Sequence, residues 1–307
     1  MALLAAPCGL VAIAPLVGPV HWSLDLMTCF VVQAGVGLAV AAAAFAVGRK
    51  WTWAAIAAAF AAAAAATVTP AWLTRPGSPP PVQSGRQIVF AAVNLLAGND
   101  QDPQLALKAI HTADVVWFSE YTPTWQRFLR EALPEHRHRL ERPDLGSFGA
   151  ALYSRFPFDA DAALVPGGHS WSPFGRATIR SPYGPIGVLG VHPPPPLPNT
   201  RGVAERDRGL AAIAPLLQAL PPRRVVLGDF NATPWNDAFQ RMRRDAGLGH
   251  GSAAWWLPSW PDPLPALLRT PIDHVLTSGR LTVTAATLGP SIGSDHRPLI
   301  ATVRVDG

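Results

Sequence analysis

The chain begins with three long apolar runs that carry almost no charge. Residues 30–48 and 51–73 are rich in alanine and contain no ionised side chain. Each is about as long as the roughly 20 apolar residues that a helix needs to cross a bilayer core. The first run, 2–20, is equally apolar but includes two prolines, which weaken a continuous helix. The pattern predicts a transmembrane region of two to three helices over residues 1–73.

Two other structures would produce apolar runs of this kind. Ala-rich helices are only weakly hydrophobic, so a helical hairpin buried in a soluble protein is one alternative. A cleaved signal peptide is the other, but such a peptide begins with basic residues. No lysine or arginine precedes Arg49, and two further apolar runs follow the first. We therefore favour membrane-spanning helices.

Basic residues beside the runs predict how these helices are oriented. Arg49 and Lys50 occupy the short turn between the second and third runs, and short basic turns remain on the cytoplasmic side. The segment between the first and second runs carries only Asp25 among acidic and basic residues, which agrees, whereas Arg75 after the third run opposes this orientation. We expect a multi-pass protein of the cytoplasmic membrane whose C-terminal part is extracytoplasmic.

A proline-rich segment at 74–86 separates this region from one with a different pattern. It contains the run Gly-Ser-Pro-Pro-Pro, which is typical of a semi-rigid polyproline spacer. From residue 87 onward, compact apolar runs alternate with amphipathic segments. Strands are predicted at residues 88–94, 115–120, 150–154, 176–180, 186–192, 224–229, 272–276, 281–286 and 299–303. Helices are predicted at residues 104–111, 201–220 and 235–244, and a further one begins at Thr122.

The number of predicted strands bears on the fold class. Strands far outnumber helices, which favours a layered α/β sandwich over a barrel with strictly alternating elements. We therefore expect one α/β domain over residues 87–307, after the transmembrane region and the linker.

The content of charged residues also changes at the linker. Of all residues 49% are apolar and 15% are charged, which excludes a disordered protein. Residues 1–85 hold one acidic and three basic side chains, whereas the remaining 222 residues hold 19 acidic and 22 basic ones. A surplus of three positive charges argues only weakly for a nucleic-acid partner, which requires a basic surface. Both cysteines lie in the apolar region, so the second region has no disulfide.

Isolated polar residues stand where predicted strands end. Loops at strand ends are where α/β proteins place their chemistry. A single such residue is commonly a cap or a turn, because Asn and Asp favour those positions. Here the feature recurs at Asn94, Glu120, His192, Asp229 with Asn231, and Asp295 with His296. The recurrence predicts that these side chains share one site.

Seven short blocks surround these residues. The two most specific are Gly-Asp-Phe-Asn-Ala-Thr-Pro at 228–234 and Ser-Asp-His-Arg-Pro at 294–298. The supporting blocks lie at 93–95, 118–120, 153–157, 191–193 and 272–276. Together they resemble the endonuclease/exonuclease/phosphatase superfamily, in the order in which that family carries them. The resemblance covers residues 87–305 and implies a four-layer sandwich of two packed β-sheets flanked by helices. It also implies hydrolysis of phosphate esters with a divalent cation, Mg²⁺ or Mn²⁺.

The resemblance implies a metal site. Glu120 is its first candidate ligand and Asp295 the second, while Asn94 helps to place the metal or a phosphate oxygen. Carboxylate oxygens suit Mg²⁺, which takes hard ligands and keeps several waters. Many nuclease members carry a charged residue two positions after the first Asn, where this chain has Leu96. One ion is therefore expected, and a second is left open.

The resemblance also implies catalytic roles. His296 is the general base that takes a proton from the attacking water, and Asp273 orients its ring. Asp229 and Asn231 position the water and contact the non-bridging phosphate oxygens. His192 stabilises or protonates the leaving group, a role that suits a side chain with a near-neutral pKa. Asn94, Asn231 and His192 are thus the residues expected to touch the phosphate.

The apolar loop before Asp273 bears on the substrate. It contains Trp-Trp-Leu-Pro-Ser-Trp-Pro at 255–261 and then Leu264, Leu267 and Leu268. A local core beneath a long loop is one interpretation. The other is that the loop meets lipid and presents a lipid-linked phosphate or pyrophosphate to the metal, which the predicted spans and short linker favour.

The sequence therefore predicts a membrane-anchored, metal-dependent phosphoesterase acting on a phosphate ester or pyrophosphate bond, with a lipid-linked substrate favoured. The first alternative is an extracytoplasmic Mg²⁺-dependent endonuclease or exonuclease acting on DNA or RNA. The second is a catalytically inactive membrane scaffold. Nothing in the sequence determines the oligomeric state.

Overall fold

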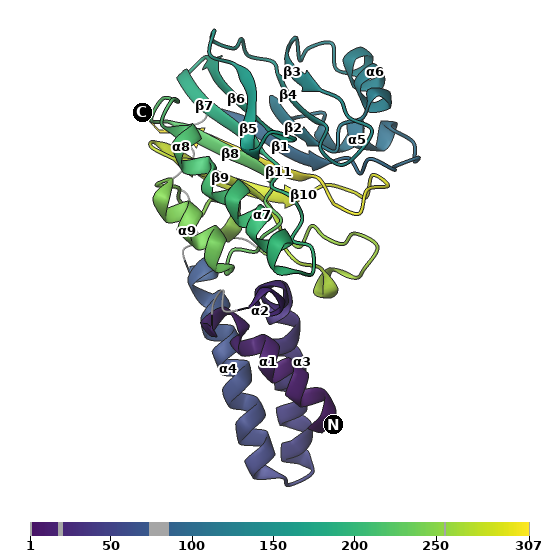
Figure 1. Ribbon diagram of the computed structural model, residues 1–307, viewed down its shortest axis with the longest axis vertical. Helices are drawn as coiled ribbons and strands as arrows, with labels where there is room; N and C mark the ends of the chain where they lie inside the picture. The colour runs from purple at the N-terminus through teal and green to yellow at the C-terminus, as the bar shows by residue number, and fades with distance from the viewer. Residues whose placement is uncertain (1, 18–20, 74–85, 255, 307) are drawn as a thin grey trace.

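The computed structural model describes residues 2–17, 21–73, 86–254 and 256–306. Within these ranges, a bundle of apolar helices stands at one end of an α/β region (Figure 1). Of the predicted linker only Arg86 belongs to the described residues, and Trp255 of the apolar loop lies outside them as well.

Four helices form the bundle. They are α1 (Ala2–Val17), α2 (Trp22–Met27), α3 (Val31–Val47) and α4 (Trp51–Leu73), and the 3-10 turn η2 (Thr28–Phe30) joins α2 to α3. In the part of the chain that the structure describes, two helical segments are long and apolar enough to cross a membrane, namely Trp22–Val47 and Trp51–Val68. The 16 residues of α1 fall short of the roughly 20 needed for a span.

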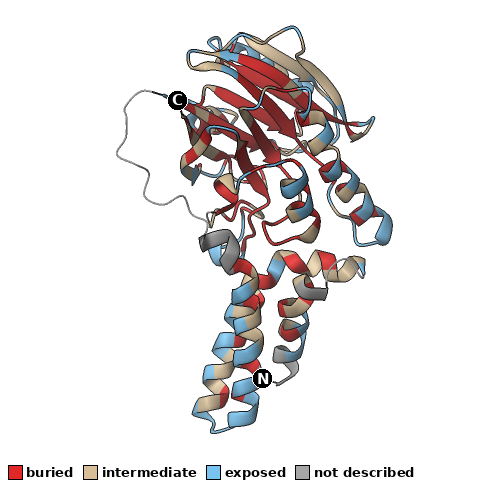
Figure 2. Cartoon of the chain, turned by 90° about the vertical axis from the view of Figure 1, so that its left-hand side faces the viewer, coloured by how far each residue is buried: buried red, intermediate tan, exposed pale blue. Residues whose placement is uncertain are grey.

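The surface of the bundle is unusually apolar. Only 22% of the apolar window in each of the two segments is buried, and Figure 2 shows exposed residues along much of α3 and α4. Large apolar side chains are among them, including Val40, Val47 and Trp51. A helix in the core of a soluble protein is buried on most sides, and these two segments are not.

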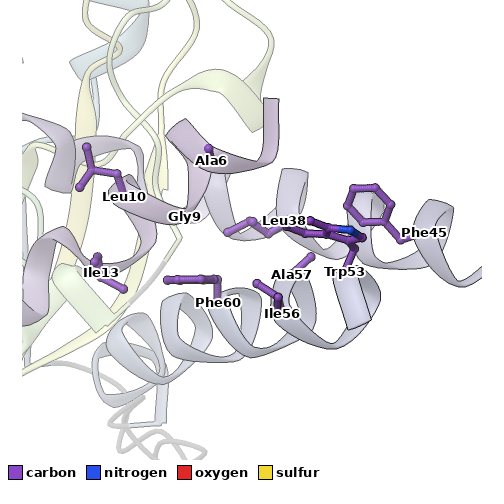
Figure 3. Close-up of a pocket in the computed structure, with 10 residues that line it drawn as sticks. All are labelled: Ala6, Gly9, Leu10, Ile13, Leu38, Phe45, Trp53, Ile56, Ala57 and Phe60. Carbon is purple, nitrogen blue, oxygen red and sulfur yellow. The ribbon is translucent and has the colours of Figure 1, made fainter. Parts of the chain in front are cut away.

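The bundle also contains a partly open apolar cavity. A cavity of about 360 Å³ lies between α1, α3 and α4, and it is lined by apolar residues that include Leu38, Phe45, Trp53 and Phe60 (Figure 3). None of its lining residues is ionisable. The cavity is therefore suited to hydrocarbon.

Two mixed β-sheets form the centre of the α/β region. One sheet has the strand order β10-β11-β1-β2-β4-β3 and the other β5-β6-β7-β8-β9. The pairs β1–β2 and β7–β8 are parallel, and the other pairs are antiparallel. The strands are β1 (Gln87–Asn94), β2 (Val115–Ser119), β3 (His138–Arg142), β4 (Ala150–Ser154), β5 (Ala163–His169), β6 (Ser172–Ser181), β7 (Gly184–Val191), β8 (Arg224–Asp229), β9 (Asp273–Ser278), β10 (Leu281–Leu288) and β11 (Leu299–Val305).

The sheets pack face to face, and helices cover their outer faces. The core between them includes Phe90, Trp117 and Leu227. Trp117 spans the interface, because its indole N–H donates to the carbonyl of Val191 in the other sheet at 3.0 Å. One outer face packs against α5 (Gln104–Ile110) and α6 (Pro123–Ala132). The other packs against α7 (Thr200–Ala211), α8 (Ile213–Leu217) and α9 (Asp237–Asp245). The predicted four-layer sandwich is confirmed.

The prediction missed two strands and joined two helices. β3 and β5 are the end strands of their sheets, and neither has the apolar pattern of a buried strand. β5 even contains Pro166, which an edge strand tolerates because it need not donate on its open side. The helix predicted over 201–220 is interrupted after Ala211, because Pro215 cannot donate to that residue's carbonyl.

Candidate active site

Strand ends from both sheets meet at one place. Asn94 ends β1, and Glu120 follows β2, which runs parallel beside it. In the second sheet, Asp229 at the end of β8 lies opposite Asp273 at the start of β9. The amide of Asn94 joins the sheets, since its Nδ2 donates to Glu120 Oε1 and to Asp229 Oδ2, each at 3.2 Å. The pairing of the strands therefore brings together side chains that are far apart in sequence.

The Asp229 carboxylate lies at the centre of the site. The Nε2 atoms of His192 and His296 each lie 3.6 Å from its Oδ2. The backbone N–H of Asn231 donates to its Oδ1 at 2.8 Å. Asp229 is buried, and burial raises its pKa to about 7 even though the positive charge of His296 opposes the rise. A carboxylate with this pKa exchanges a proton near neutral pH.

The two imidazoles differ in charge. Burial lowers the pKa of both, and it brings that of His192 to about 4, so this ring is neutral at pH 7. At His296 the carboxylates of Asp273 and Asp229 outweigh burial and raise the pKa to about 10. The Nδ1 of His296 donates to Asp273 Oδ2 at 2.8 Å, while its Nε2 faces Asp229. One neutral and one protonated imidazole thus flank the same carboxylate.

Asn231 and Asp295 reach the site through the loops that carry them. The side-chain Nδ2 of Asn231 donates to the carbonyl of Pro193 at 3.0 Å. The Oδ2 of Asp295 accepts from the indole N–H of Trp260 at 3.0 Å. Its negative charge also helps to raise the pKa of the neighbouring His296.

The acidic residues suit a hard cation. Asp229, Asp273 and His296 each offer a ligand atom within 4.8 Å of the others, but the Nδ1 of His296 already donates to Asp273. At the site, two buried carboxylate oxygens, Oδ1 of Asp273 and Oδ1 of Asp295, have no hydrogen-bond partner within the described ranges. Orphaned buried carboxylate oxygens are the ligands that Mg²⁺ prefers. The donor set therefore fits a divalent cation.

Hydrogen bonds hold each of the predicted metal ligands in place. Glu120 Oε1 accepts from Asn94, and its Oε2 accepts from the backbone N–H of Ala97 at 2.9 Å. Asp295 is held separately, through its hydrogen bond from Trp260. Asn94 presents its amide nitrogen to the carboxylates, because its Oδ1 accepts from the backbone N–H of Leu96 at 3.1 Å.

Backbone strain is concentrated at the site. Four non-glycine residues in the described part of the chain have positive φ angles, and three of them are Leu96, Glu120 and Asn231, at 59°, 57° and 49°. A residue in this left-handed region costs on the order of 1–3 kcal/mol and persists where the surrounding structure enforces it. Such strain is typical of residues that must present a side chain in a set direction.

Sequence reasoning missed several aromatic neighbours of the site. Trp260, which binds Asp295, was seen only as part of an apolar loop. A row of rings also leads away from His192, since the ring of Phe148 lies 6.2 Å from His192 and 4.5 Å from Trp171. These two are single aromatic residues without a local pattern, so no sequence signal could have revealed them.

Comparisons with known proteins agree with this architecture. The family model described as "Endonuclease/Exonuclease/phosphatase family" matches residues 82–296. No curated protein matches the sequence.

Solved structures of the same architecture share little sequence with this chain. The endonuclease/exonuclease/phosphatase from Beutenbergia cavernae is 17% identical with a TM-score of 0.56, covering 73% of this chain and 72% of its own. Sphingomyelinase C from Streptomyces griseocarneus is also 17% identical with a TM-score of 0.53, covering 71% and 99%. D. rerio TDP2 complexed with single-strand DNA product is 13% identical with a TM-score of 0.56, covering 71% and 99%. At these identities the likeness concerns the fold.

Proposed function

Because this chain belongs to the endonuclease/exonuclease/phosphatase family, we propose that it is a membrane-anchored, divalent-metal-dependent phosphoesterase. Members of the family hydrolyse phosphoesters. The bond cleaved here is a phosphate ester or pyrophosphate bond of a lipid-linked substrate. The observation that carries the proposal is the buried Asp229 carboxylate. It lies 3.6 Å from the Nε2 atoms of both His192 and His296, and it accepts a hydrogen bond from Asn94.

In this proposal Asp229, rather than His296, takes the proton from the attacking water. Both ring nitrogens of His296 face carboxylates, those of Asp273 and Asp229, so the ring keeps its proton. A positive imidazolium at this position stabilises negative charge that develops on the phosphoryl oxygens. The backbone N–H of Asn231 holds the Asp229 carboxylate in place. His192, which is neutral, is left to assist the leaving group.

Glu120 and Asp295 would hold the divalent ion, with Asn94 beside them. Mg²⁺ or Mn²⁺ bound there would neutralise charge on the phosphoryl group. The strained backbone of Glu120, with its φ of 57°, directs the carboxylate toward Asn94. We expect one ion, because Leu96 supplies no charged group where nuclease members carry one.

The apolar helices support the membrane anchor. Two helical segments have the length and hydropathy of a span, and large apolar side chains are exposed on them. The turn with Arg49 and Lys50 lies at the end of the bundle away from the α/β region (Figure 1). If this basic turn is cytoplasmic, the active site lies on the extracytoplasmic side of the membrane.

The apolar loop supports a lipid-linked substrate. Trp256 stacks on Trp235 and packs against the bundle. Further along the loop, Leu264, Leu267 and Leu268 are exposed, by 41%, 74% and 49%. The loop thus contributes both to a local core and to an exposed apolar surface beside the helices.

The test is an activity comparison on the full chain purified in detergent. We expect Mg²⁺-dependent release of phosphate from a polyprenyl diphosphate, which is lost with a chelator and in E120A and H296A. Cleavage of plasmid DNA without lipid turnover would instead establish the nuclease alternative. An unchanged cellular phenotype in both variants would favour the inactive scaffold.

A further inference from the structure

A second cavity lies where the helical bundle meets the active site. Its volume is about 320 Å³. Leu26, Cys29 and Phe30 line it from α2 and η2, and Asn231 and Trp260 line it from the α/β region. Asn231 donates its backbone N–H to Asp229, and Trp260 donates its indole N–H to Asp295. The cavity therefore lies between the apolar helices and residues that neighbour the proposed reaction centre.

Three polar side chains of this lining each make a hydrogen bond. The hydroxyl of Thr270 donates to the carbonyl of Cys29 at 2.9 Å. The Trp260 indole donates to Asp295, and the Asn231 amide donates to Pro193. The rest of the cavity lining is mostly hydrocarbon. An ester or amide group placed there would find few hydrogen-bond donors, which is costly wherever the bound chain excludes water.

The chemistry and size of the cavity select one kind of lipid. In a polyprenyl phosphate the hydrocarbon begins directly at the phosphate oxygen, whereas glycerolipids and sphingolipids place ester or amide groups between the two. An apolar cavity of about 150 Å³ binds benzene, so about 320 Å³ accommodates roughly a dozen carbon atoms. We propose that this cavity binds the first carbons of a polyprenyl phosphate or diphosphate, an inference that rests on the proposed function.

The helical wall of the cavity is fastened to the catalytic segment. Asp25 on α2 forms an ion pair with Arg206 on α7 at 2.8 Å, and both side chains are buried. Asn236 Nδ2 donates to Asp25 Oδ1 at 3.0 Å, and the Trp235 indole donates to the carbonyl of Thr28. Trp235 and Asn236 follow the block that contains Asp229 and Asn231. The bundle thus supplies a fixed part of the substrate site.

The experiment measures chain-length selectivity. The full chain in detergent is assayed with Mg²⁺ on farnesyl diphosphate and on dimethylallyl diphosphate, and the ratio of the two kcat/KM values is determined. We expect L26W, which fills the cavity, to lower this ratio at least tenfold, as changes in an apolar pocket do. The matched control is V40W, because Val40 is 65% exposed on α3 and does not line the cavity. V40W should keep the wild-type ratio.

The ratio does not depend on the fraction of folded enzyme, because both substrates are measured on one preparation. Wild-type enzyme without preference for farnesyl diphosphate, or an unchanged ratio in L26W, would overturn the inference and leave the phosphoesterase in place. Preferred turnover of sphingomyelin or phosphatidate would overturn the choice of lipid. No hydrolysis of any of these substrates would overturn the proposed function itself.

Discussion

At the scale of single residues, the chemistry of the site depends on how charge is distributed around Asp229. Burial, helped by the negative charge of Asp273, raises the pKa of this carboxyl group to about 7, and a protonated and a neutral imidazole both lie beside it. The same residue types in water would all titrate at their ordinary pKa values. The division of labour among them is therefore a property of the packed site.

The pH dependence of the rate tests the role of Asp229. A base acts only when deprotonated, so kcat/KM should rise with pH and level off above about pH 7, where Asp229 loses its proton. D229N cannot accept a proton, and we expect its rate to fall at least about a hundredfold and its acidic limb to disappear. A D229N enzyme that keeps the acidic limb would assign that limb to another group.

Trp260 is predicted to act on the metal through Asp295. W260F keeps an aromatic ring but removes the N–H that donates to Asp295 Oδ2. Loss of such a partner weakens metal binding by about 10–100-fold, so the Mg²⁺ concentration for half-maximal activity should rise by that factor. The control is W51F, because Trp51 is 66% exposed on α4. Equal Mg²⁺ requirements in the two variants would exclude this role for Trp260.

At the scale of elements, the site exists because strands of two sheets end at the same edge. β1 and β2 are parallel neighbours, so Asn94 and Glu120 emerge side by side, and the pairing of β8 with β9 places Asp229 opposite Asp273. The α2 helix is attached to the α/β region through α7 and the start of α9. Its attachment relies on a buried ion pair, and a buried charge that loses its partner is strongly destabilising.

The ion pair between Asp25 and Arg206 gives a stability prediction. D25A leaves the Arg206 guanidinium, 1% exposed, with Asp207 as its remaining partner. We expect the variant to lose about 3 kcal/mol of stability, near the lower end of the range for buried pairs, seen as a lower midpoint of thermal unfolding in detergent. R201A removes an exposed pair on the same helix, with Glu205, and should cost less than about 1 kcal/mol. Similar midpoints for D25A and R201A would refute the proposed attachment.

At the scale of the whole molecule, specific contacts hold the apolar bundle to the α/β region. The bundle exposes apolar side chains over α3 and α4, while the α/β region buries its apolar residues between sheets and under helices (Figure 2). The contacts between the two parts lie next to the active site rather than away from it. A lipid substrate would thus meet the enzyme at the junction of the two environments.

The proposed membrane orientation is tested by labelling. A variant without Cys8 and Cys29 receives a single cysteine at either Lys50, in the basic turn, or Leu145, which is 86% exposed in the α/β region. A membrane-impermeant maleimide should label L145C in intact cells and K50C only after permeabilisation, if the basic turn is cytoplasmic as we propose. Labelling in the opposite order would place the active site in the cytoplasm.

Sequence reasoning succeeded where the signal is local. Apolar runs mark α3, α4 and the buried strands, because burial of a segment requires its own side chains to be apolar. Asn94, Glu120 and Asp229 stand at strand ends that the pattern also locates. The edge strands β3 and β5 were not predicted. A strand at the edge of a sheet needs neither an apolar run nor hydrogen bonds to neighbours on both sides.

The sequence by itself was sufficient to predict the apolar helices and the layered α/β fold. Its family blocks also indicated the candidate site residues. Only the tertiary structure decided which side chains contact one another. It alone paired Asp25 with Arg206, 181 residues away, and Trp260 with Asp295. It also raised the pKa of Asp229 and retained the proton of His296. The physical reason is that pairing and desolvation depend on distance in space, which local sequence patterns do not encode.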